Sequence, residues 1–81
     1  MDNTQIIAHL KKENYYLDIR ELEDGTIVGI ADLLYTRAIF FDMSLTGFSQ
    51  RFCFSDKELA NEEFQKLKNM DSEPEGYIAR R

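Results

Sequence analysis

Alternating apolar and polar residues predict a β-sheet in the middle of the chain, between Tyr15 and Phe54. Most of the β-branched and aromatic residues lie in this stretch, and only short turn signals interrupt them. The pattern predicts a four-stranded antiparallel meander, with strands in Tyr15–Leu22, in a second run ending near Asp32, and in Ala38–Met43 and Phe48–Phe54.

Two helices are predicted on either side of these strands. Residues 4–12 carry one apolar stripe, and Asp2 and Gln5 at its start have the spacing of a capping box. A second capping box, from Ser55 to Glu58, opens a longer amphipathic helix in which Phe64 is a candidate core anchor. The only proline, Pro74, marks a surface linker, and residues 76–80 are a candidate fifth strand at an edge of the sheet.

The predicted fold class is therefore α+β, with the element order αββββα(β) and both helices packed on one face of a four- to five-stranded antiparallel sheet. The chain has 81 residues, which suits a single domain over residues 1–81. No internal repeat or low-complexity tract suggests a second unit.

A two-residue turn at Asp24-Gly25 is the strongest hairpin signal in the sequence. Counting outward from it pairs Leu22 with Ile27 and Ile19 with Ile30. The same count sets Leu17 opposite Asp32, so we expect the pairing to end, or a bulge to intervene, before Asp32.

Strict alternation in the later strands defines two faces. It assigns Ile39, Phe41 and Met43 to one face of the third strand and Phe40 to the other. In the fourth strand it places Phe48 on the same core face as Phe52 and Phe54. The small residues Gly29 and Ala31 lie on the opposite face of the second strand, where they permit close approach of another element or ligand.

Composition narrows the possible functions. The net charge of −5 argues against direct binding to nucleic acid or to an anionic membrane. Cys53 is the only cysteine and His9 the only histidine, so neither an internal disulfide nor a structural zinc site is expected. No apolar run approaches the roughly 20 residues of a membrane-spanning helix, and no secretion signal is evident, so a cytoplasmic location is expected.

Candidate catalytic groups are few. His9 and Cys53 could form a dyad only if the first helix crosses the fourth strand, and Asp18, Asp32 and Asp42 could bind a divalent cation only if they converge. The ordinary interpretation, in which these are helix-surface, sheet-surface and packing residues, is favoured. We therefore predict that the protein is not an enzyme and uses no cofactor or metal.

Two possible binding functions depend on the charge of the surface. The tyrosines could form a stacking platform for single-stranded nucleic acid, but acidic residues interleave with the arginines that such a platform requires. The many glutamates and aspartates could imitate a nucleic-acid backbone and regulate a DNA-binding protein, but a solvated acidic surface that keeps the domain soluble is the favoured interpretation. A small-molecule-binding domain is the remaining alternative.

The leading expectation is a non-catalytic protein–protein interaction module, an inhibitor or adaptor, acting on another protein or as a homodimer. In size and general build the chain resembles the small acidic accessory proteins of phages and other mobile elements. Tyrosine and arginine are enriched at interface centres. Residues of these two types on the uncovered sheet face, together with one leucine and one phenylalanine, form the predicted surface: Tyr16, Arg20, Leu33, Tyr35, Arg37, Phe40 and Arg51.

Overall fold

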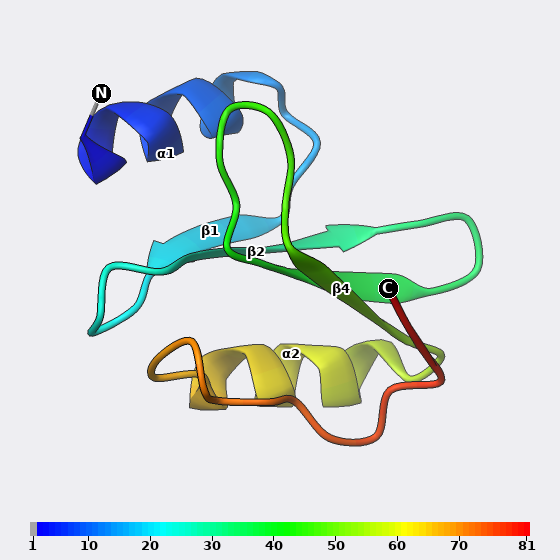
Figure 1. The fold of residues 1–81 in the computed structure, drawn as a ribbon. Coiled ribbons are helices and arrows are strands. Elements are labelled where there is room, and N and C mark those ends of the chain that lie inside the picture. The colour runs from blue at the N-terminus through cyan, green and yellow to red at the C-terminus, as the bar shows by residue number, and fades with distance from the viewer. Residues whose placement is uncertain (1) are drawn as a thin grey trace.

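The computed structural model describes residues 2–81 and shows three layers, with one helix on each side of a central sheet (Figure 1). The elements are α1 (Asn3–Lys12), β1 (Asp18–Glu21), β2 (Ile27–Asp32), β3 (Arg37–Phe41), β4 (Gln50–Phe54), α2 (Lys57–Lys66) and β5 (Ala79–Arg80). The strands form one antiparallel sheet in the order β1-β2-β3-β4-β5. The predicted α+β class, the meander and the short fifth strand are confirmed.

The two helices begin at acidic caps. Asp2 caps α1 in a full capping box, because its side chain accepts from the amide of Gln5 and the Gln5 side chain accepts from the amide of Asp2. α2 begins one residue later than predicted, because Asp56 accepts from the amides of Glu58 and Leu59. The predicted cap at Ser55 is therefore wrong, and the aspartate beside it supplies the carboxylate that the helix dipole favours.

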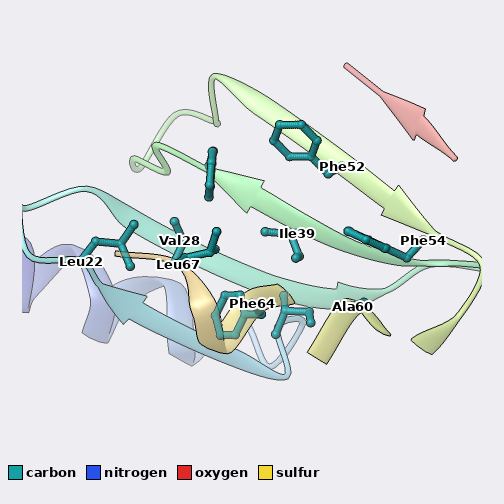
Figure 2. Packing of buried hydrophobic residues seen from close by; sticks show 10 residues of the cluster. Leu22, Val28, Ile39, Phe52, Phe54, Ala60, Phe64 and Leu67 are labelled. Atoms are coloured by element: carbon teal, nitrogen blue, oxygen red, sulfur yellow. The ribbon is translucent and has the colours of Figure 1, made fainter. Parts of the chain in front are cut away.

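α2 covers one face of the sheet, which we call the α2 face (Figure 2). Phe41, Phe52 and Phe54 from the sheet pack there with Phe64 from the helix, and all four are at most 1% exposed. Partly buried Leu59 and Tyr77 extend the cluster. The rest of this core consists of Leu22, Val28, Ile30, Ile39, Ala60 and Leu67.

α1 lies against the opposite face, which we call the α1 face, so the prediction that both helices pack on one face is wrong. Leu10 of α1 is buried there in a second cluster with Ile19, Ile27 and Phe40. The physical reason is the apolar character of both faces of the central strands, in which Phe40 and Phe41 are neighbours that point to opposite sides. A helix of 10 residues covers only one of those faces.

The β1–β2 hairpin has a three-residue loop, Glu23 to Gly25, instead of the predicted two-residue turn. Glu21 faces Ile27, and the amide of Leu22 donates to the carbonyl of Thr26. Gly25 has a φ of +88°, the left-handed conformation that closes three-residue hairpin loops. The loop shifts the register by one residue, so Ile19 faces Gly29 and the predicted pairing of Ile19 with Ile30 is wrong.

β1 bulges at its start, which confirms the expected interruption before Asp32. Asp18 is the register partner of Ile30, yet the amide of Leu17 also donates to the Ile30 carbonyl, so two residues stand opposite one. The Asp18 side chain accepts from the amide of Ile19. A short, bulged and charged strand of this kind is poorly suited to pairing with another chain along its free edge.

A second departure from regular alternation occurs at Asp42, directly after β3. Its φ is +57°, the left-handed region that is uncommon for residues other than glycine. This turn of the backbone places Met43 on the α1 face, so its predicted position beside Ile39 and Phe41 is wrong. The β3–β4 loop that follows stands on the same side of the sheet as α1 (Figure 1).

The β1–β2 turn joins all three layers. The Asn3 side chain at the start of α1 donates to the carbonyl of Gly25 over 2.8 Å. After α2, the amide of Met70 donates to the Asp24 carboxylate over 2.8 Å, and the carbonyl of Lys68 accepts from the amide of Glu23. The hydrogen bond from Met70 is the main reason that the pKa of Asp24 lies below its usual value.

Candidate interaction surface

Four aromatic side chains follow one another across the α1 face, and we call them the aromatic row: Tyr15, Tyr16, Phe40 and Phe48. Their ring centroids are 5.0, 5.7 and 4.9 Å apart in that order. Each neighbouring pair meets edge to face, the arrangement that aromatic quadrupoles prefer.

The row is buried in its centre and open at its ends. Phe40 is 3% exposed, whereas Tyr15 is 50% exposed and Phe48 is 43% exposed. Burial raises the pKa of the Tyr16 hydroxyl, and the nearby Glu13 carboxylate adds to that shift. Tyr16 therefore stays neutral and packs as an apolar residue between Tyr15 and Phe40.

Gly29 makes room for this row. A Cβ atom at Gly29 would lie 2.6 Å from the Met43 sulfur and 3.4 Å from Cδ1 of Tyr16. The sequence indicated that the small residues here permit close approach of another element or a ligand, and the groups that approach are Met43 and Tyr16 of the same chain.

The β3–β4 loop holds Phe48 and Leu45 at the surface. The amide of Ser44 donates to the carbonyl of Gly47 over 2.8 Å, and the Ser49 hydroxyl donates to the Asp42 carboxylate over 2.7 Å. These bonds close the loop on itself while leaving Leu45 42% exposed. The loop therefore presents two large apolar side chains from a hydrogen-bonded frame.

Four of the seven predicted surface residues lie on the α1 face. Tyr16 and Phe40 belong to the aromatic row, and Leu33 packs, partly buried, against the same cluster. Arg51 is the cross-strand partner of Phe40, so their side chains are neighbours. Phe40 is almost wholly covered, so it supports the surface and does not itself form an accessible contact.

Two predicted surface residues lie on the other face, contrary to the prediction. Arg20 donates from Nη2 to the carbonyls of Phe64 and Leu67, over 2.6 and 3.1 Å, at the C-terminal end of α2. Arg37 pairs with Asp32 over 2.7 Å and donates to Asn61 of α2. Both arginines attach the sheet to α2 because they alternate with α1-face residues along their strands.

The seventh residue, Tyr35, lies in the β2–β3 turn and is 84% exposed. Its neighbour Leu34 is equally open. The β2–β3 turn is at the opposite end of β3 from the loop that carries Phe48, so the structure does not bring Tyr35 to the aromatic row.

Sequence reasoning missed Tyr15, Leu45 and Phe48 as surface residues. Phe48 was predicted to face the α2 core, but it contacts Phe40 on the α1 face and precedes the first residue of β4. The available signal was the Asp-Met-Ser-Leu-Thr-Gly run from residue 42, whose polar and glycine content is typical of a loop that breaks strand alternation.

His9 is exposed on α1, whereas the cysteine and the aspartates considered for catalysis or metal binding have local structural contacts. Cys53 is buried in the α1-face core, and Asp32 pairs with Arg37, which lowers the pKa of the Asp32 carboxyl. Asp18 and Asp42 bind the amide of Ile19 and the hydroxyl of Ser49. Within residues 2–81 we find no pocket and no cluster of side chains suited to a metal ion. None of the helices in the same range is long and apolar enough to cross a membrane.

Comparison of the chain with protein-family models, with curated proteins and with solved structures finds no match.

Proposed function

We propose that the protein is a non-catalytic protein–protein interaction module, an inhibitor or adaptor, and that it binds its partner through the aromatic row and the adjoining β3–β4 loop. The accessible part of this surface consists of Tyr15, Leu45 and Phe48, supported from beneath by Tyr16 and Phe40.

The observation that carries the proposal is the exposure of Phe48 on a closed loop. A phenylalanine that is 43% exposed forgoes part of the roughly 1.5–3 kcal/mol that full burial of such a side chain contributes. Phe48 nevertheless keeps an edge-to-face contact with Phe40, and hydrogen bonds flank it on both sides. An aromatic side chain in such a frame loses little conformational entropy on binding, which is the property of an interface anchor.

The test is a comparative affinity capture with three immobilised proteins: wild type, Phe48→Ser and Leu34→Ser. Leu34 is the matched control because it is an exposed apolar loop residue at the other end of β3. From a lysate of the producing cell, we expect a partner that wild type and Leu34→Ser retain and Phe48→Ser loses. Thermal melts of the three proteins establish that each remains folded. Identical retained proteins in all three captures would refute the proposed surface.

We further propose that the protein is cytoplasmic. The thiol of Cys53 is free and buried, which suits a reducing compartment. Labelling of intact and permeabilised cells with a tagged copy tests this location, and a signal outside the cell would contradict it.

A further inference from the structure

We propose that the partner presents an acidic segment, with a carboxylate beside an apolar side chain, and that Arg51 and Arg81 bind the carboxylate next to the aromatic row. This inference rests on the proposed function above and names the chemistry of the partner at the same surface.

Arg51 and Arg81 lie directly opposite each other on neighbouring strands. The amide of Arg51 donates to the carbonyl of Arg81 and the amide of Arg81 to that of Arg51, each over 2.8 Å. Residues paired in this way direct their side chains to the same face of the sheet. That face is the α1 face, because Cys53, two residues from Arg51, is part of the α1-face core.

The two guanidinium groups have no internal partner. No ion pair and no side-chain hydrogen bond within residues 2–81 involves Arg51 or Arg81, and Nε of Arg51 is buried without an acceptor. Their neighbour Arg80 differs, since it pairs with Glu73 over 3.3 Å and lies over the Phe52 ring on the α2 face. Like charges directly opposite each other destabilise a sheet, so the fold itself gains nothing from this pair.

A protein of net charge −5 thus places two arginines that have no ion-pair partner within residues 2–81 opposite each other on the α1 face. A carboxylate is a planar acceptor that matches the guanidinium fork. Arg51 is also the cross-strand neighbour of Phe40, on which Phe48 packs. A ligand that contacts both the arginines and Phe48 therefore needs an acidic and an apolar group close together.

The charge of the rest of the chain favours a peptide over a nucleic acid. A nucleic acid carries a phosphate at every nucleotide and needs several cations along its path. Here two arginines stand on a protein with 15 acidic and 10 basic residues, which repels an extended polyanion but tolerates a few carboxylates.

The experiment is a selection of random short peptides displayed on phage against the wild-type protein. Binding of the selected peptides is then measured by fluorescence polarisation to wild type, to the double variant Arg51→Gln/Arg81→Gln, to Phe48→Ser and to Arg80→Gln. Arg80→Gln is the matched control, because it removes the neighbouring charge from the opposite face.

We expect the selected peptides to contain Asp or Glu beside an aromatic or aliphatic residue. The double variant should weaken their binding about tenfold or more, as loss of hydrogen bonds to charged groups does. Arg80→Gln should leave it unchanged. The melting temperature of the double variant should equal or exceed that of wild type, because the like-charge pair is gone.

Several results would overturn the inference and leave the proposed function standing. One such result is the selection of peptides that lack acidic residues but whose binding still depends on Phe48. Binding of an oligothymidylate that the double variant abolishes would assign the arginines to phosphate, and a dimer in sedimentation that the double variant dissolves would assign the carboxylate to a second copy of the chain. Selected peptides indifferent to Phe48, or no selected peptide at all, would count against the proposed surface itself.

Discussion

Replacement of Arg20 by methionine should destabilise the protein by about 2–4 kcal/mol, because Arg20 holds the end of α2 on the sheet. Its Nη2 atom donates to the carbonyls of Phe64 and Leu67 at the C-terminal end of the helix, where the Phe64 carbonyl otherwise accepts only a long 3.4 Å bond from the amide of Leu67. Its guanidinium also lies 5.0 Å from the centroid of the Phe64 ring.

The magnitude follows from these contacts. A hydrogen bond to a charged group contributes about 1.5–3 kcal/mol, and a cation over an aromatic face adds about 0.5–2 kcal/mol. The contributions overlap because one guanidinium makes them all, and methionine retains part of the packing. For a small domain a loss of this size lowers the melting temperature by roughly 10–25 °C.

The assay is urea unfolding followed by far-UV circular dichroism, with Arg80→Met as the control. Arg80 also pairs with a carboxylate and lies over a phenylalanine ring, but it is exposed, so its replacement should cost less than about 1 kcal/mol. An Arg20→Met protein within about 1 kcal/mol of wild type would refute the role assigned to Arg20. Such stability combined with lost partner binding would return Arg20 to the interaction surface.

Three further predictions concern the core, a carboxylate and a turn. Phe64→Ala should cost about 3–5 kcal/mol in urea melts, and a cost below about 1 kcal/mol would contradict its place in the α2-face core. Glu63 accepts from the amide of Glu75 and from Lys66, and these bonds, that from Glu75 first, hold the pKa of its carboxyl below its usual value. Because the folded-state pKa is depressed, this stabilisation is complete above about pH 5 and is lost as the pH falls below about 4. Urea melts across this pH range should therefore show that Glu63→Gln loses less stability on acidification than wild type does. If the two proteins lose the same stability on acidification, Glu63 does not contribute to the acid sensitivity of the fold. Gly25→Ala should cost about 1–2 kcal/mol of stability because φ is +88°. Gly25→Asn should cost less, since asparagine adopts that conformation more readily. Thermal melts that show wild type and both variants to be equally stable would exclude strain at this turn.

Local signals in the sequence predicted the elements well because each depends on neighbouring residues. The capping box from Asp2 to Gln5 forms as expected, and the amphipathic stripe around Phe64 packs into the core between α2 and the sheet. The alternation of Phe52 and Phe54 correctly identified the α2 face. These features require only hydrogen-bonding groups and periodicity that are visible within a few residues.

The arrangement of the elements was harder to predict because it depends on backbone conformations that several residue types permit. Gly25 closes a three-residue loop where a two-residue turn also fits its sequence, and the difference is a whole register shift. Asp42 adopts a positive φ that its residue type allows but does not require, and this moves Met43 to the opposite face. The aromatic row forms beyond such breaks, so its members were only partly identified in advance.

The shared attachment of both helices to the β1–β2 turn also constrains the order of folding. Asn3 of α1 binds Gly25, and the chain after α2 binds Asp24 and Glu23, so neither helix can complete its final contacts until the hairpin has closed. The hairpin is local in sequence and closes at low entropic cost, whereas the contact from Met70 to Asp24 spans 46 residues. Early hairpin closure therefore prepares one docking point that is shared by two helices on opposite sides of the sheet.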